Sequence, residues 1–399
     1  MCNWYHRTID GNPRIEALTG LRWCAALAVF LSHFAPKGVE SSLFTTFCSN
    51  GYMGVTIFFV LSGFVLTITY SKGLAEPSAT NTWNYAVARV ARVIPLYLFV
   101  LCLVVASRRN AAPLSALWQH ALALQAWSGD VKIAYAWNGP GWSVGVELFL
   151  YAMFPLLILL TRFLKSTRSV VWLGIAVVAL MTLVLIFFHI TGRDQLPLSD
   201  PASAHRWIYR SPLLRLGDFT LGICCAVIYA RERHRTLLLR AAPLVAAAMS
   251  VLILTLMMIP QISLTSPTFD LAYALPGAIL ILGLALSPGQ GIARLLGSAA
   301  LVLLGELSYA FYLIHAPAGR LLMTVMRDES SGSHLKSAAV WLGCLLLLIA
   351  LSWVLHISIE RPARVFLRKR LSRHSGSQSA PKASQSANHD RTTPLIPET

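Results

Sequence analysis

RIEALTGLRWCAALAVFLSHFAP, residues 14–36, is an apolar stretch that carries two ionisable side chains among its hydrophobic residues. Arg22 stands near its start and His33 near its end, eleven residues apart. An α-helix returns to nearly the same face after eleven residues, so the two side chains share a stripe about 16 Å long. An ionisable side chain inside a membrane span costs on the order of 3 kcal/mol and usually faces a protein interior or a water-filled cavity. The stretch therefore predicts a first membrane helix with a polar path along one side.

The composition of the chain is that of a membrane protein. Of its 399 residues, 56% are hydrophobic and only 13% are charged, a balance too apolar for an ordinary soluble domain. Apolar runs recur along the chain, each close to the ~20 residues that cross the hydrocarbon core of a bilayer. We therefore predict an all-α fold, a polytopic membrane helix bundle of about ten transmembrane helices in the lipid bilayer. The predicted spans lie near residues 15–35, 52–70, 93–107, 143–162, 170–190, 212–230, 239–258, 269–287, 299–319 and 337–357.

The excess of basic residues has a topological explanation. A formal net charge of +16 would suggest a nucleic-acid partner in a soluble protein. Here Lys and Arg gather in the loops that alternating spans place on one side, about twice as many as on the other, which is the positive-inside pattern. We therefore predict no nucleic-acid partner and place both termini in the cytoplasm.

The chain divides into one long membrane domain and two short ends. We assign residues 1–14 to a cytoplasmic N-terminus, 15–370 to a transmembrane domain and 371–399 to a disordered cytoplasmic tail rich in Ser, Pro and Lys. Segment 113–127 is apolar on one face and is expected to be an interfacial or re-entrant helix. None of the seven cysteines has the spacing of metal ligands, so no metal site is predicted.

Two arginines precede the third predicted span. Arg89 and Arg92 are three residues apart and share a face if the segment is helical. They can be ordinary anchors at the cytoplasmic end of a span. They can also bind a multiply charged phosphate ligand, because each guanidinium presents a planar fork of donors. Both interpretations are open at this point.

The fourth predicted span carries a carboxylate. Glu147 follows Trp142 and Ser143 about one turn into an otherwise apolar helix, where a charge is more often functional than structural. The predicted topology puts Glu147 at the level of His33, so the carboxylate could hold the imidazole in one tautomer and strengthen it as a base. The alternative is an ion pair between Glu147 and an intramembrane arginine.

Other polar residues lie in or at the ends of the later spans. Arg215 and Asp218 are three residues apart and predict either a self-contained ion pair or a contribution to the polar cavity. His315 in the ninth span is either a packing residue or part of the site. Glu360 and Arg361 are expected to cap and anchor the end of the tenth span.

Seven pieces of the chain together resemble the acyltransferase-3 family of bacterial integral membrane acyltransferases. Over residues 14–364 and in the family's order, they are RIEALTGLRWCAALAVFLSHF, GVTIFFVLSGFVLT, ARVARVIPLY, GWSVGVELFLYAMFP, LRLGDFTLG, LGELSYAFYLIHAP and IERPA. Arg22 and His33 match the family's paired Arg and His of the first span. Arg89 and Arg92 match its Arg-x-x-Arg motif. Trp142, Ser143 and Glu147 match its Trp-Ser-x-x-x-Glu motif. The chain departs from the pattern at LTGLRW, where Thr19 replaces the family's Asp, so an acidic contact from that position is not expected.

The resemblance implies an acyl-CoA-dependent O-acyltransferase in the inner membrane of a bacterium, with acetyl-CoA as the expected donor substrate and no bound cofactor. The expected acceptor is a hydroxyl group of a glycan, a lipid-linked glycan or a small secreted metabolite, as in polysaccharide modification. His33 is the expected general base, oriented by Glu147. The remaining candidates are expected to bind the CoA phosphates, namely Arg22, Arg89 and Arg92, or the substrate, namely Trp142, Ser143 and His315.

Two alternatives stand beside this interpretation. A covalent acyl-His33 intermediate could replace direct transfer. A transporter or flippase could use intramembrane His, Glu and Arg side chains as a path for protons or substrate. The lack of inverted repeats and the concentration of Arg at one predicted cytoplasmic mouth favour the enzyme.

Overall fold

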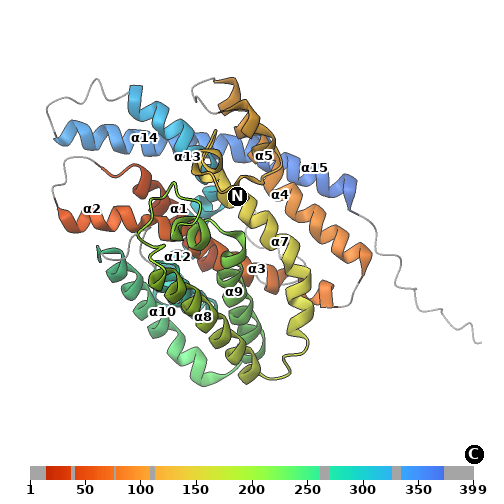
Figure 1. Cartoon of the computed structure of the whole chain (residues 1–399). Coiled ribbons are helices and arrows are strands. Elements are labelled where there is room, and N and C mark those ends of the chain that lie inside the picture. Colours follow the sequence, from red (N-terminus) through yellow and green to blue (C-terminus); the bar gives the residue numbers. More distant parts are fainter. Residues whose placement is uncertain are drawn as a thin grey trace, which may run out of the picture.

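The computed structural model describes residues 15–36, 41–75, 78–107, 113–260, 269–325 and 334–372. In this part of the chain every regular element is a helix, and no β-strand occurs. The long helices pack together in a bundle (Figure 1). The predicted all-α bundle is therefore confirmed.

Long helices occupy all ten ranges that the sequence predicts as spans. Their bounds are α1 Glu16–His33, α3 Gly54–Ala75, α4 Ala79–Ala106, α7 Trp142–Thr161, α8 Thr167–Ile190, α9 Pro212–Glu232, α10 Thr236–Met257, α11 Phe269–Leu286, α13 Ala299–Val325 and α14 His334–Leu355. The other helices are α2 Ser42–Ser49, η1 Asn50–Met53, η2 Leu114–Ala116, α5 Leu117–Ala121, η3 Gln125–Trp127, α6 Val131–Ala134, η4 Gly139–Gly141, η5 His205–Tyr209, α12 Gly291–Leu296, η7 His356–Glu360 and α15 Arg361–Leu371.

Eight helical stretches of the described residues are long and apolar enough to cross a membrane. The two predicted spans outside this set are α1 and α11. α1 has 18 residues and carries charged or titratable side chains at Glu16, Arg22 and His33. The apolar part of α11, Leu271–Leu286, is shorter still. Both helices pack against other long helices, α1 against α13 and α3, α11 against α10 and α9, so protein surrounds much of their surface.

Burial separates the central helices from those at the periphery. In the stretch Ser42–Leu74, which includes all but the last residue of α3, 78% of the apolar window is buried, whereas the windows of α8 and α10 are 17% buried. The exposed faces of α8 and α10 are rich in large apolar side chains and suit contact with lipid tails. α1 is held in the middle by aromatic packing, because Trp23 and Phe30 meet Phe311 of α13 at ring-centroid distances of 5.0 and 5.6 Å. Arg22 and His33 are thus carried on a central helix.

One helix begins well before its predicted span. α4 starts at Ala79 instead of residue 93, because its polar first half lies beside α15 (Figure 1). The indole Nε1 of Trp83 on α4 donates a hydrogen bond to the carbonyl oxygen of Leu371 at the end of α15, 2.8 Å away. α15 also extends one residue into the range assigned to the tail. The predicted tail from residue 373 and the predicted N-terminus, 1–14, lie outside the described residues.

Segment 113–127 does not form the single helix that was predicted. It is divided among η2, α5 and η3. His120 and Gln125 are buried, and their side chains are tied inside the fold. His120 bonds through Nε2 to the carbonyl oxygen of Ile133 at 2.8 Å, and the Gln125 amide donates to the hydroxyl of Tyr97 at 3.0 Å. The side chains of His120 and Gln125 thus fasten this segment to the bundle.

Glycine allows α3 and α9 to approach closely. A Cβ at Gly63 would stand 2.0 Å from the carbonyl oxygen of Phe219, and one at Gly222 would stand 2.0 Å from that of Val60. Backbone atoms cannot move aside as a flexible side chain can. Gly63 and Gly222 therefore allow the close helix packing for which small residues are commonly found between membrane helices.

We expect Gly63→Ala to lower the thermal stability of the purified protein, because overpacking a tight contact costs about 1–3 kcal/mol. Gly73→Ala in the same helix is the matched control, since a Cβ there meets nothing within 4 Å. The melting temperature in detergent measures both variants. A Gly63→Ala protein as stable as the Gly73→Ala protein would contradict the close packing of α3 on α9.

Candidate active site

A cavity of about 990 Å³ runs through the middle of the bundle. Along α3 its lining extends from Val55 to Thr69, which is about 21 Å of helix at 1.5 Å per residue. Helices α1, α4, α7 and α13 and the α14–α15 region complete the wall. The polar and charged side chains that line it are Glu16, Thr19, Arg22, Ser62, Thr69, Arg89, Arg92, Ser143, Glu147, Tyr151, Glu306, Ser308, Tyr309, Tyr312, His356, Glu360, Arg361 and Arg364.

Three predicted arginines meet in this cavity. Arg89 is fixed in place, because its guanidinium donates to the hydroxyl of Tyr70 at 2.7 Å and stacks over the rings of Tyr70 and Tyr151. Arg22 and Arg92 form no hydrogen bond or ion pair with any other residue in the described ranges, although both line the cavity. Two guanidinium groups therefore face the cavity with their donors available to a ligand.

Glu147 also lines the cavity, on the side of these arginines. Its carboxylate accepts a hydrogen bond from the hydroxyl of Tyr151, one turn further along α7. It is also close enough to Arg22 to interact with that guanidinium electrostatically. The structure does not place Glu147 against His33, so the predicted orientation of the imidazole by this carboxylate is wrong. Glu147 shares the cavity wall with the arginines, but it forms no ion pair with any of them in the described part of the chain, so the alternative ion pair is not seen either.

His33 ends α1 and takes its orientation from the helix itself. Its Nδ1 lies 2.9 Å from the carbonyl oxygen of Val29. A carbonyl oxygen can only accept, so Nδ1 carries the hydrogen and Nε2 of the neutral ring keeps its lone pair. The tautomer suited to a base at Nε2 is therefore set by the backbone. The side chain is exposed at the end of the helix.

His315 of α13 repeats this arrangement beside His33. The two rings lie edge to face with centroids 5.1 Å apart. Nδ1 of His315 lies 2.6 Å from the carbonyl oxygen of Tyr312, and its buried Nε2 has no hydrogen-bond partner among the described residues. The structure thus brings the two predicted histidines together, with both Nε2 atoms able to accept a proton or hydrogen bond.

The histidine pair lies just beyond one end of the cavity. Tyr312 and Ser143 line this end, and their hydroxyl groups are 2.8 Å apart. The Tyr312 ring contacts that of His315, with centroids 5.5 Å apart, but neither histidine lines the cavity itself. Trp142 is buried against Tyr209, at a centroid distance of 4.9 Å, and does not line the cavity either.

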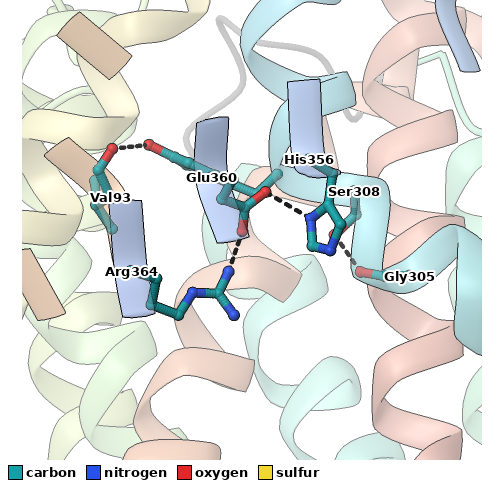
Figure 2. A network of polar contacts seen from close by, with 7 residues as sticks. Val93, Gly305, Ser308, His356, Glu360 and Arg364 are labelled. Atoms are coloured by element: carbon teal, nitrogen blue, oxygen red, sulfur yellow. Dashed lines mark hydrogen bonds and ion pairs between the residues drawn. The ribbon is translucent and has the colours of Figure 1, made fainter. Parts of the chain in front are cut away.

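The end of the tenth span supplies a group that the sequence analysis assigned to anchoring. Figure 2 shows Glu360 between His356 and Arg364. Its carboxylate accepts from Nδ1 of His356 at 2.9 Å and from the guanidinium of Arg364. These three residues and Arg361 line the cavity, so the segment is part of the site. The charged residues in HISIERPAR, 356–364, could have indicated a part of the site, but charges at the end of a span usually anchor the helix.

The pair Arg215–Asp218 stands apart from the cavity. Both side chains are fully buried and their closest N and O atoms are 2.9 Å apart, as the ion-pair interpretation predicted. Nearby, in the connection before α9, burial and the charges of Arg210 and Arg215 lower the pKa of His205 to about 3. Its ring is therefore neutral at physiological pH and bonds through Nε2 to the hydroxyl of Tyr135 at 3.0 Å. This cluster fastens the connecting segments to the bundle.

Comparison with known proteins identifies the family. A family model described as acyltransferase domain, that of the acyltransferase-3 family, matches residues 15–357. The chain belongs to this family. The match includes the first span and most of the cavity wall, so the protein is a multi-pass membrane acyltransferase.

Individual relatives agree with this assignment. The acyltransferase MdmB of Streptomyces mycarofaciens is 31% identical over 383 residues, which cover 90% of this chain and 93% of the relative. The O-acetyltransferase OatA of Staphylococcus aureus (strain NCTC 8325 / PS 47) is 23% identical over 331 residues, 77% of this chain but only 51% of OatA. Protein 2 in the picA locus of Rhizobium radiobacter matches 23% of this acyltransferase at 37% identity. No solved structure matches the chain significantly.

Proposed function

We propose that this acyltransferase moves an acyl group, acetyl in the simplest case, from cytoplasmic acyl-CoA to a hydroxyl group, with His33 as general base. The observation that carries the proposal is the cavity, which has arginines in its wall and leads toward the histidine pair. The distribution of loop charges supports a cytoplasmic position for its arginine-rich end, where acyl-CoA would be available.

The donor site follows from the charges of the cavity wall. Acyl-CoA carries its phosphates at one end and the thioester at the other end of a long, largely uncharged pantetheine arm. Guanidinium groups bind phosphate oxygens through paired hydrogen bonds, so Arg22, Arg89 and Arg92 would hold the phosphate end. Glu147, which lines the same cavity, would act on the Arg22 guanidinium through its charge. The arm would then run along α3 toward Ser143 and Tyr312.

The proposed reaction uses the free lone pair of His33. Nε2 takes the proton of the acceptor hydroxyl while the hydroxyl oxygen bonds to the thioester carbonyl carbon. The carbon–sulfur bond then breaks, and the thiolate of CoA takes the proton back from Nε2, leaving an ester, CoA thiol and the neutral ring. The hydroxyl groups of Ser143 and Tyr312 lie at the end of the cavity nearest the histidines, and both are bonded to the carbonyl oxygen of Pro140. One of them would have to turn away from that carbonyl to donate to the thioester oxygen as it gains charge.

The exposed position of His33 favours an acceptor that arrives from the opposite side to the donor. The carbohydrate or metabolite hydroxyl would meet His33 at the end of α1, while acyl-CoA fills the cavity from the other end. The similarity to OatA, an O-acetyltransferase, supports acyl transfer to oxygen.

Donor use and acceptor class call for two measurements on the wild-type protein. Purified full-length protein in nanodiscs is titrated with CoA by calorimetry, and we expect saturable binding that weakens as salt rises. Cells with and without the protein are compared for ester-linked acetyl groups on surface glycans and on secreted small molecules, and one of these pools should lose its acetyl groups. A protein that binds no CoA would refute the donor assignment.

A further inference from the structure

The cavity wall holds a second group of arginines, separate in sequence from the first. Arg361 and Arg364 come from α15, whereas Arg89 and Arg92 come from α4. The two helices lie side by side (Figure 1), so both groups face one cavity. The hydrogen bond from Trp83 to the carbonyl oxygen of Leu371 fastens the far end of α15 to α4.

Glu360 fixes the direction of Arg364. The carboxylate is only 2% exposed, and it accepts from both His356 and Arg364 (Figure 2). One edge of the guanidinium is therefore committed to Glu360. Nε of Arg364 is buried and has no hydrogen-bond partner in the described part of the chain, and the same holds for Nε of Arg89 on α4. The guanidinium groups of Arg364 and Arg89 thus each have an unpaired N–H donor beside the cavity. Burying an unpaired donor costs free energy unless a ligand accepts a hydrogen bond from it.

Arg364 lies close enough to Arg89 and Arg92 to interact with them electrostatically, so the two groups form one cationic wall that suits a ligand with more than one anionic group. CoA has this form, because a diphosphate joins the pantetheine arm to the ribose and a further phosphate stands on the 3′ oxygen of the ribose. The diphosphate lies nearer the thioester and so belongs deeper in the cavity. Arg22 lies almost two turns into α1, whereas Arg361 is exposed and Arg364 sits on the helix that follows the last span. The α15 group is therefore the outer one.

We propose that Arg364, held by Glu360, binds the 3′-phosphate of the donor, while Arg22, Arg89 and Arg92 bind its diphosphate. The inference rests on the proposed function, since it refines how the same cavity holds acyl-CoA. It makes Arg364 a specificity-determining residue. Donors that lack this phosphate, such as a phosphopantetheine arm on a carrier protein, lose the contact with α15.

The test compares CoA with 3′-dephospho-CoA on the purified full chain, with affinities from calorimetry. We expect the wild-type protein to bind CoA roughly 10- to 100-fold more tightly, the scale of a hydrogen bond between charged groups. Arg364→Ala should remove this preference by weakening CoA alone, and Arg364→Lys should restore part of it. Arg92→Ala should weaken both ligands by the same factor. Arg368→Ala, an exposed arginine of α15 outside the cavity lining, is the control that leaves both affinities unchanged.

Two results would overturn the assignment. Equal wild-type affinity for the two ligands would show that the 3′-phosphate has no partner, and this result needs no variant to fold. Equal weakening of both ligands by Arg364→Ala and by Arg364→Lys would show that Arg364 acts on the diphosphate or on the fold. In either case binding of CoA stands and the proposed donor with it, whereas a wild-type protein that binds neither ligand refutes both proposals.

Discussion

Replacing His33 by alanine lowers the rate of acyl transfer by roughly 10² or more and leaves the affinity for CoA nearly unchanged, because loss of a general base has an effect of that size. The ring lies beyond the cavity, so the residues that hold the donor keep their positions. The exposed side chain also contributes little to the core, and the variant should fold. Transfer rate at saturating donor and CoA affinity are measured on the same preparation.

The control for this variant is a histidine far from the site in sequence. His234 is exposed in the turn between α9 and α10, and alanine there should change neither quantity. An active His33→Ala protein would end the assignment of His33 as base. A His33→Ala protein that loses CoA binding as well would place the imidazole in the donor site, contrary to its position at the exposed end of α1.

Helical periodicity predicted much of the bundle and part of the site. Apolar runs located the long helices, and the three-residue spacing of Arg89 and Arg92 predicted that they share one face of a helix. Both side chains do line the cavity on α4. These features depend on local sequence alone, because a helix fixes which residues share a face.

Helical periodicity does not predict how deep in the bundle a side chain lies. Counted from the start of its predicted span, Glu147 is expected at the level of His33. In the structure η4, which precedes α7, is already inside the bundle, where Asn138 donates to the carbonyl oxygen of Leu313 at 2.9 Å. Glu147, further along α7, therefore lines the cavity together with Arg22, whereas His33 lies outside it. Such a shift arises from tertiary packing, which no local pattern reports.

The contribution of α15 was missed for a related reason. Charges at the end of a span are usually anchors, and HISIERPAR fits that pattern. Only the packing of α15 on α4 turns Arg364 and Glu360 toward the cavity. The contact between His33 on α1 and His315 on α13 could not be predicted from local sequence either, because the two residues are far apart in the chain.

Replacing Arg92 by alanine weakens CoA binding by about 1–3 kcal/mol, or roughly 5- to 150-fold in Kd, and leaves turnover at saturating donor close to that of the wild type. Arg92 forms no hydrogen bond or ion pair within the described residues, so its removal costs the fold little. The loss should be larger at low salt than at high salt, because ions screen the attraction between guanidinium and phosphate. Calorimetry at two salt concentrations measures this dependence.

The neighbouring arginines have different contacts, so we expect their variants to differ from Arg92→Ala. Arg89→Ala should lose CoA affinity and also thermal stability, since Arg89 bonds to Tyr70 and stacks over two rings. Arg22→Lys keeps the charge but not the planar fork, so a partial loss of affinity is expected. Arg294→Ala, at an exposed arginine of α12 outside the cavity, is the control. If Arg92→Ala instead lost stability, binding and turnover together, these arginines would be structural, and the phosphates of the donor would have to bind elsewhere.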